Sequence, residues 1–275
     1  MFIVEPLAAE HPFRKHPGIT LTPHLGASTG EAQEKCGIEV AEVITGYLLT
    51  GEVRNAVNLP YLDAKTYEQV KPYLLLGEKL GKLLAQLAPL QVDRLHVTYG
   101  GKAQELPNID PVTRAVVLGF LSRASVKDLN NVNVRSIAAT LGLTVEEKRS
   151  SEPVTFNEWL HVQAFNGNEK VISAGGTFFG SPNNPRIVRL YSTPVEIPIS
   201  GIMLLLTNKD RPGIVGHLGT LLGKHKVNIA SMSLSRDTTD GDAFTVLNLD
   251  SEPSAAVLAE LQQDDGIRNV KVVKL

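Results

Sequence analysis

The stretch "GIMLLLTNKDRPGIVGHLGTLLGKHKVNIASMSL" (201–234) contains a strand signal, a helix signal and a second strand signal in succession. The apolar run at 201–208 predicts a strand, and the apolar spacing within 210–226 predicts a helix. Pro212 falls near the first turn of that helix, where its fixed φ and missing N–H are tolerated. The chain beyond it predicts strands at 227–237 and 242–250, a helix at 252–265 and a last strand at 267–275.

The order βαββαβ within 201–275 predicts a ferredoxin-like domain. Such a sheet carries its helices on one face only. We therefore expect its other face, or an edge strand, to be available for a partner.

Three polar residues stand at the ends of these predicted elements. Asn208 and Asp210 lie where the first strand turns into the helix, and Asn228 opens the next strand. We expect them at related ends of neighbouring elements, near a positive helix N-terminus. Amides and one carboxylate suit a zwitterionic amino acid, because its ammonium needs acceptors and its carboxylate needs donors. Asn and Asp are also common turn and capping residues, so both interpretations stay open from the residues alone.

The region before this domain predicts a mixed α/β domain that begins after "VRNAVNLP" (53–60), an extended linker. Helical spacing occurs at 66–90, disturbed near Pro72, and again at 110–124 and 133–143. Strand-like runs occur at 93–101, "LTVEEKRS", "EWLHVQAF", "KVISAGGTFFG" and "PRIVRLYSTPVEIPI".

Arg186 and Arg189 flank the strand "PRIVRL" in this middle region. Guanidinium groups suit phosphate, so these two are the candidates for a phosphorylated effector. Solvated surface arginines are the competing interpretation for each one taken singly. The aromatic pair in "GTFFG" (176–180) is better explained by packing.

The N-terminal region contains "TPHLGAST" (22–29), which places His24 on a tight turn, and Glu5 lies upstream. A carboxylate can orient an imidazole that exchanges a proton with a substrate hydroxyl. Ser28 and Glu31 form a capping-box pattern for a helix that should run to about Thr50. Its apolar positions are Ile38, Ala41, Ile44, Tyr47 and Leu48.

Composition excludes several classes of protein. The 275 residues suffice for two compact domains, and the net charge is −2 with no basic run, so we expect no nucleic-acid partner. Cys36 is the only cysteine, which suits a reducing cytoplasm and offers no second thiolate to a metal. Signal-peptide and transmembrane patterns are missing from the sequence, so we expect a cytoplasmic protein without a membrane partner. The histidine spacings predict no metal site. No G-x-G-x-x-G follows a strand; "GHLGTLLG" (216–223) lies inside a helix pattern.

The whole chain resembles the C-terminal two-thirds of the long-form D-3-phosphoglycerate dehydrogenases, a family of NAD-dependent enzymes that open the phosphorylated route to L-serine. "MFIVEPL" (1–7) and "LTPHLGASTGEAQ" (21–33) are similar to the end of the D-2-hydroxyacid dehydrogenase catalytic unit, and "TGEVRNAVNLP" (50–60) to the hinge after it. "NNVNVRSIAATLGL" (130–143), "AGGTFFG" and "PRIV" resemble the intervening, or allosteric substrate-binding, domain, and "NKDRPGIVGHLGTLLGKHKVNIASM" (208–232) resembles an ACT domain, the family's amino-acid sensor.

The resemblance implies roles for named residues. His24 matches the family's proton-transferring histidine and Glu5 the glutamate that pairs with it, while Asn208, Asp210 and Asn228 fall on the serine-contact positions of the ACT domain. The family's Rossmann domain and substrate-binding arginine have no counterpart in this sequence. We therefore expect no bound NAD and no dehydrogenase activity from this chain alone.

From these patterns we expect a remnant of the catalytic unit at 1–55, an intervening domain at 56–197 and an ACT domain at 198–275. The fold class is α/β and α+β, with a mixed intervening domain before a ferredoxin-like domain and no Rossmann domain. L-serine is the expected effector, and a homo-dimer or tetramer through the ACT and intervening domains is the expected assembly. An oligomerisation module indifferent to serine and a stand-alone amino-acid regulator are the alternatives. Arg135 stands where the family often has proline, so the local backbone is expected to differ there.

Overall fold

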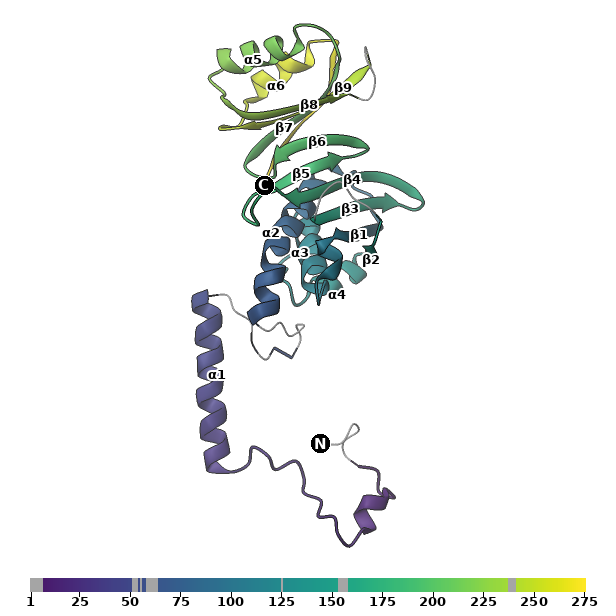
Figure 1. Ribbon diagram of the computed structural model, residues 1–275, viewed down its shortest axis with the longest axis vertical. Helices are drawn as coiled ribbons and strands as arrows, with labels where there is room; N and C mark the ends of the chain where they lie inside the picture. Colours follow the sequence, from purple (N-terminus) through teal and green to yellow (C-terminus); the bar gives the residue numbers. More distant parts are fainter. Residues whose placement is uncertain are drawn as a thin grey trace. The chain divides into compact units, whose positions relative to one another are not determined.

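The computed structural model describes residues 7–50, 54, 56–57, 64–124, 126–152, 158–236 and 241–275. The chain divides into two compact units, residues 1–56 and 57–275. The first unit contains a short 3-10 helix, η1 (Pro12–Lys15), and the long helix α1 (Gly30–Thr50) (Figure 1). The second unit contains two β-sheets with their helices.

Helix α1 confirms the helix predicted to run to about Thr50. Its first turn is capped by Thr29, whose Oγ1 accepts a hydrogen bond from the amide of Ala32 at 3.2 Å, and not by the predicted Ser28. Four of its predicted apolar residues are more than half exposed: Ile38, Ile44, Tyr47 and Leu48. Within the described residues the apolar face of α1 therefore remains open to solvent.

The larger sheet of the second unit has six strands in the order β2-β1-β3-β4-β5-β6. The strands are β1 (Arg94–Gly101), β2 (Thr144–Ser150), β3 (Glu158–Asn166), β4 (Glu169–Phe178), β5 (Pro185–Leu190) and β6 (Thr193–Pro198). β1 and β2 are parallel, and the chain between them forms η2 (Lys102–Glu105), α3 (Asp110–Leu121) and α4 (Val134–Thr140). A parallel pair needs such a crossover because its strands run in the same direction.

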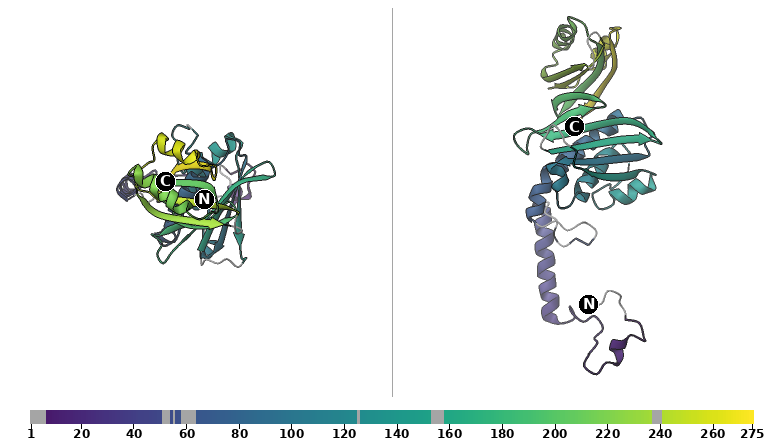
Figure 2. Two further views of the ribbon diagram at one scale, coloured as in Figure 1. Left: turned by 90° about the horizontal axis from the view of Figure 1, so that it is seen from above. Right: turned by 45° about the vertical axis from the view of Figure 1, so that its right-hand side comes forward.

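Helix α2 (Ala64–Leu87), which continues through Pro72, and α3 lie on one face of this sheet (Figures 1 and 2). Alternate residues of the strands, such as Val97 and Val162, face these helices and are fully buried. The two helices approach each other closely at a pair of glycines. A Cβ on Gly81 would lie 2.1 Å from the carbonyl oxygen of Val116, and a Cβ on Gly119 would lie 2.1 Å from that of Glu78.

The second sheet has four antiparallel strands in the order β10-β7-β9-β8. Its elements are β7 (Ile202–Lys209), α5 (Ile214–Lys224), β8 (Ile229–Arg236), β9 (Asp242–Leu249), α6 (Ala255–Gln262) and β10 (Ile267–Lys274). The predicted βαββαβ order is confirmed. Pro212 lies near the first turn of α5, as predicted, directly before the N-cap residue Gly213. Gly213 has φ 89°, a conformation that favours glycine.

Both faces of this second sheet are covered within the unit. Leu204 and Leu206 pack with α5 and α6, whereas Met203 and Leu205 of the same strand join the core formed by the six-stranded sheet and α2. Val246 and Val273 belong to that same core. Of the two surfaces expected to be available to a partner, the helix-free face is not, because residues of the middle region fill it, and an edge strand is the one that remains.

Polar contacts reinforce this junction. The side chain of Gln86 in α2 donates to the carbonyl of Lys274 at 2.9 Å and accepts from its amide at 3.0 Å. Asn248 Nδ2 donates to the carbonyls of Pro198 and Ser200, in the segment that joins the two sheets. β8 remains an edge strand of the four-stranded sheet.

The glycine contact between α2 and α3 yields a first prediction. Gly81→Ala and Gly119→Ala each force a methyl group against backbone that cannot move without separating the helices, so each should lower the free energy of unfolding by about 2–3 kcal/mol. Urea unfolding of the full chain, followed through the fluorescence of the single tryptophan, Trp159, measures this. Gly219→Ala in α5 is the control, because a Cβ there meets nothing within 4 Å and should stabilise the helix slightly. If neither Gly81→Ala in α2 nor Gly119→Ala in α3 lowers the urea midpoint of unfolding, the packing argument is contradicted.

Candidate functional site

A cleft of about 440 Å³ lies where β7 turns into α5. One wall is the N-terminal turn of α5 with the segment before it, and the other is the end of β8. The lining residues are Asp210, Arg211, Pro212, Gly213, Ile214, Val215, Gly216, Leu234 and Arg236. Charged groups and small or apolar residues meet in one concave space, which is typical of sites for small molecules.

Asp210 and Arg236 form an ion pair inside this cleft. Nη1 of Arg236 lies 2.5 Å from Oδ2 of Asp210, and the side chain of Asp210 is only 17% exposed. Arg211, the other cation of the lining, lies 2.5 Å from Asp264 Oδ2. The cleft thus presents one carboxylate and one guanidinium already in contact.

Sequence reasoning found Asp210 and missed Arg236. The available signal was topological. β7 and β8 run parallel, on either side of β9, so their C-terminal ends lie at the same end of the sheet. A cation at the end of the second strand therefore lies close to a carboxylate after the first.

Asn208 is fully buried and does not line the cleft. Its Oδ1 accepts from the hydroxyl of Thr245 at 2.7 Å, and its Nδ2 donates to the carbonyl of Lys209 at 3.1 Å. In this structure the amide holds the end of β7 against β9. The prediction that Asn208 contacts an effector stays a prediction.

Asn228 lies at the opposite end of the sheet from Asp210. It precedes β8, whose start pairs with the end of β9, and its Nδ2 donates to Asp250 Oδ2 at 2.7 Å. The expectation that the three polar residues share related ends of neighbouring elements is therefore wrong for Asn228. The reason is strand direction: β7 and β8 are parallel, so the start of one is remote from the end of the other.

Arg186 and Arg189 share one face of the six-stranded sheet. The pairing between β4 and β5 shifts by one residue, so that Arg186 pairs with Thr177 and Arg189 with Gly175. Thr177 and Gly175 are alternate residues of β4, so their side-chain positions lie on the same face of the sheet, the face away from α2. Arg186 and Arg189 therefore share that face, because the bulge adds one residue between them. The Arg186 guanidinium lies over Phe179 at 5.8 Å and that of Arg189 over Trp159 at 5.6 Å.

Trp159 and His161 form a stacked pair on the same face. Their ring centroids are 4.8 Å apart, and the Trp159 ring fills the space that a Cβ on Gly100 or Gly175 would need. His161 Nε2 is buried and has no hydrogen-bond partner among the described residues. Burial lowers the pKa of His161 to about 4, assisted by the charges of Arg189 and Lys170. The neutral imidazole is therefore the form that the folded chain prefers.

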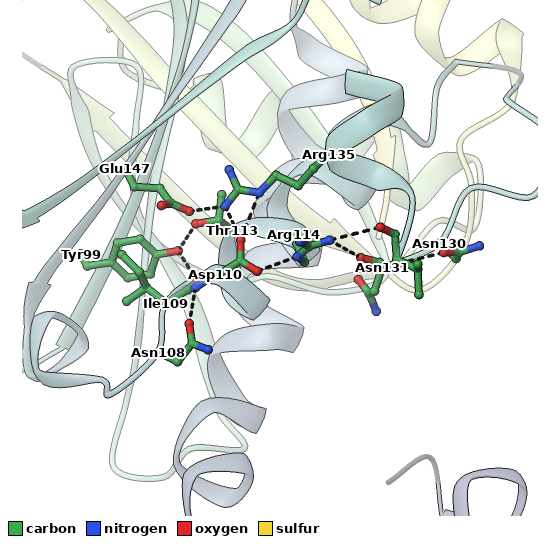
Figure 3. Close-up of polar contacts among 11 residues, drawn as sticks. Tyr99, Asn108, Ile109, Asp110, Thr113, Arg114, Asn130, Asn131, Arg135 and Glu147 are labelled. Carbon is green, nitrogen blue, oxygen red and sulfur yellow. Dashed lines mark hydrogen bonds and ion pairs between the residues drawn. The ribbon is translucent and has the colours of Figure 1, made fainter. Parts of the chain in front are cut away.

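A network of charged side chains joins α3, α4 and β2 (Figure 3). Asp110 accepts from Arg114 Nε and from Arg135 Nη2, both at 2.6 Å, and Arg135 also donates to Glu147. Burial acts to raise the pKa of Asp110, but the hydrogen bonds from the two arginines outweigh it and hold this pKa below its usual value. The charges neutralise one another, so we assign this network to stability at the junction of the helices.

Arg135 is the position at which the resemblance leads us to expect a proline, with a local backbone that differs. It is the second residue of α4, where a helix tolerates proline because the amide there has no intrahelical acceptor. The backbone is helical with arginine in place, and the guanidinium adds the contacts to Asp110 and Glu147.

His24 is exposed in the first unit, with φ 37° on its turn, and Glu5 lies outside the described residues. Their pairing therefore stays a prediction. Within the ranges that the structure describes, no group of three or more His, Cys, Asp or Glu residues could hold a metal ion. None of the helices described is long and apolar enough to cross a membrane.

A dinucleotide does not fit the described residues. The sheets are antiparallel apart from the β1–β2 pair, so they lack the parallel arrangement that holds pyrophosphate at strand ends. The turn before α5 places the Asp210 carboxylate, which would repel a pyrophosphate. No step of a hydride transfer can be derived from these groups.

Comparison with known families matches both parts of the second unit. Residues 69–191 match the model of the D-3-phosphoglycerate dehydrogenase intervening domain, and residues 202–266 match the ACT domain.

Similar proteins cover the chain from end to end. It is 38% identical over 275 residues to a D-3-phosphoglycerate dehydrogenase of Synechocystis, covering all of this chain and 49% of that protein. A protein of the same name from Archaeoglobus fulgidus is 33% identical, over 98% of this chain and 51% of that protein. Another, from Methanocaldococcus jannaschii, is 31% identical, over 97% of this chain and 51% of that protein. The chain therefore spans about half the length of the curated relatives it matches.

The buried imidazole yields a prediction on pH. The folded-state pKa of His161 lies below the ordinary 6.5, so the unfolded chain binds more protons between these values. The contribution to stability is complete above about pH 6.5 and is lost as the pH falls toward 4. Urea unfolding by circular dichroism across pH 7 to 4 measures this loss.

His161→Gln should flatten this part of the pH profile, and Arg189→Gln should reduce it by removing a neighbouring positive charge. His16→Gln, in the first unit, is the control. If the stability of His161→Gln depends on pH in the same way as that of the wild type, the imidazole of His161 is not the titrating group.

Proposed function

Since residues 69–191 belong to the intervening-domain family of D-3-phosphoglycerate dehydrogenase and residues 202–266 to the ACT family, we propose that this chain is the regulatory part of such an enzyme. Its function is to sense L-serine through the ACT domain and to act in the cytoplasm. In this proposal the residues form three domains: a part of the catalytic unit (1–55), the intervening domain (56–197) and the ACT domain (198–275).

One observation carries the proposal for sensing: Asp210 and Asn228 lie at opposite ends of the sheet within one chain. Seven residue steps along β8 span about 23 Å, so a single small ligand cannot reach both. An effector site that uses both residues therefore needs two chains.

The edge position of β8 supports a way to complete that site. If two β8 edges pair antiparallel about a two-fold axis, the start of one strand lies beside the end of the other. Asn228 of one chain then approaches the cleft that Asp210 and Arg236 line in its partner. The assembly is a homo-dimer, or a tetramer if the intervening domains also pair.

Arg186 and Arg189 are proposed as the binding site for a phosphorylated effector in the intervening domain. Their support is the bulge that places both guanidinium groups on one face of the sheet. Two guanidinium groups on the same face can share one phosphate, which neither could hold as well alone.

The dehydrogenase reaction itself is proposed for the whole enzyme, in which NAD accepts a hydride from 3-phosphoglycerate. His24 and Glu5 are proposed as its proton-transferring pair. The remaining catalytic groups and the NAD site lie outside the residues described here.

Binding of L-serine tests the sensor. Calorimetric titration of the purified chain should give saturable heat, which Asn228→Ala and Asp210→Ala should each abolish. A one-to-one mixture of these two variants should recover about a quarter of the wild-type sites, because only mixed dimers contain one intact site.

Absence of heat in the wild type, with an unchanged dimer in sedimentation runs with and without serine, would favour the oligomerisation module. If each variant loses the heat and the mixture does not recover it, L-serine sensing would still be supported, but a binding site shared between two chains would be contradicted.

Dehydrogenase activity provides a separate prediction. The purified chain with NAD and 3-phosphoglycerate should form NADH no faster than its His24→Ala variant, because the described residues do not fit a dinucleotide. Absorbance at the NADH band measures the rate, and turnover that depends on His24 would contradict the proposal.

A further inference from the structure

The hairpin between β3 and β4 carries the dipeptide Asn166-Gly167, which is the only asparagine–glycine pair in the sequence. Asn166 pairs with Glu169, which leaves Gly167 and Asn168 as a two-residue loop. Gly167 has φ 58°, and the first position of such a loop favours glycine. Asn166 and Gly167 are both exposed, so water reaches the dipeptide.

An asparagine followed by glycine can lose ammonia without an enzyme. The backbone nitrogen of the glycine attacks the side-chain carbonyl carbon of the asparagine, and the new N–C bond closes a five-membered succinimide ring. The amide nitrogen leaves as ammonia and takes the proton of the glycine N–H. Water then opens the ring at either carbonyl, which gives aspartate or isoaspartate. The rate depends on how freely the glycine nitrogen can approach the carbon, and glycine has no side chain to obstruct it.

Two adjacent side chains at the start of β1 hold this glycine in place. The amide of Gly167 donates to Asp93 Oδ2 at 2.7 Å, and its carbonyl accepts from Arg94 Nη2 at 2.8 Å. The backbone of Asp93 is fixed as well, because its amide donates to the carbonyl of Phe165 at 3.0 Å and its carbonyl accepts from the amide of Thr144 at 2.8 Å. The fold therefore places a carboxylate on the nitrogen that would have to attack.

We propose that Asn166 is a site of spontaneous deamidation and that Asp93 restrains the reaction in the folded chain. The hydrogen bond from the Gly167 amide to the carboxylate is charge-assisted, and it must break before the nitrogen attacks. The negative charge of Asp93 also opposes loss of the amide proton, because a second negative charge would form beside it. The site lies within the intervening-domain match and does not line the cleft beside α5.

Deamidation changes both the charge and the backbone of this hairpin. Either product adds a carboxylate next to the peptide that Asp93 holds, and isoaspartate also adds one carbon to the main chain between β3 and its turn. The pairing of Asn166 with Glu169 would then lose its register. A chain whose hairpin opens locally loses the restraint and accumulates the modification faster.

Peptide mapping by mass spectrometry on the full chain, after incubation at neutral pH, measures the rate. Trypsin releases residues 150–170 as one peptide, which contains Asn166 and also Asn168 as an internal reference. Asp93→Ala should raise the rate at Asn166 about tenfold, which corresponds to the loss of one charge-assisted hydrogen bond. Asp93→Asn keeps an acceptor without the charge, so its rate should lie between those of Asp93→Ala and the wild type.

A matched control is Asp242→Ala, which removes another exposed aspartate whose contact, to Arg268, lies in the four-stranded sheet. Its rate at Asn166 should equal that of the wild type. Unfolding in urea separates the effect of the fold from the chemistry. In urea the wild type and Asp93→Ala should deamidate Asn166 at one common rate, faster than the folded wild type, because only the fold brings Asp93 to Gly167.

Circular dichroism checks that Asp93→Ala is folded, and if it is not, Asp93→Asn decides the test. An unchanged rate at Asn166 in the folded Asp93 variant would overturn the restraint. A slower rate would overturn it too, because Asp93 would then act as a general base for the attack. A wild-type chain that stays unmodified at Asn166 even in urea would overturn the site itself.

Discussion

Burial of the helix-free face of the four-stranded sheet is the constraint on which the second unit depends. Met203, Leu205, Val246 and Val273 project from that face into the core of the six-stranded sheet. A ferredoxin-like sheet with one bare apolar face would expose it to water, and burying it is the dominant favourable contribution to such contacts. The two sheets therefore form one compact unit, although each has helices of its own.

This burial decides which surfaces remain for a ligand. With one face against the middle region and the other under α5 and α6, the sheet retains its edges and the ends of its strands. The cleft occurs at such an end, where β7 turns into α5 beside the end of β8. Because β8 also contacts the middle region, through the amide of Glu196 donating to Ser233 Oγ at 3.1 Å, it touches both the cleft and the neighbouring sheet.

Local sequence signals predicted the positions of the helices and strands well, but they predicted poorly which of these lie next to one another in the fold. Apolar spacing predicts α1, and alternation predicts β1, since these depend on residues a few positions apart. The cap of α1 was placed one residue early because Ser28 and Thr29 carry the same chemistry. The candidate site was half predicted: Asp210 follows a visible strand–helix turn, but Arg236 is linked to it only through the strand order of the sheet.

By itself the sequence determined the βαββαβ order, the mixed α/β region before it, and the carboxylate after the first strand, because periodicity and turn residues are local. Only the tertiary structure decided that Asn228 lies far from Asp210, that a bulge aligns Arg186 with Arg189, and that the middle region covers the free face of the second sheet. Each of these depends on strand direction or register between segments distant in the chain. Such pairings are fixed by the combined burial of both sheets, which no single stretch of residues encodes.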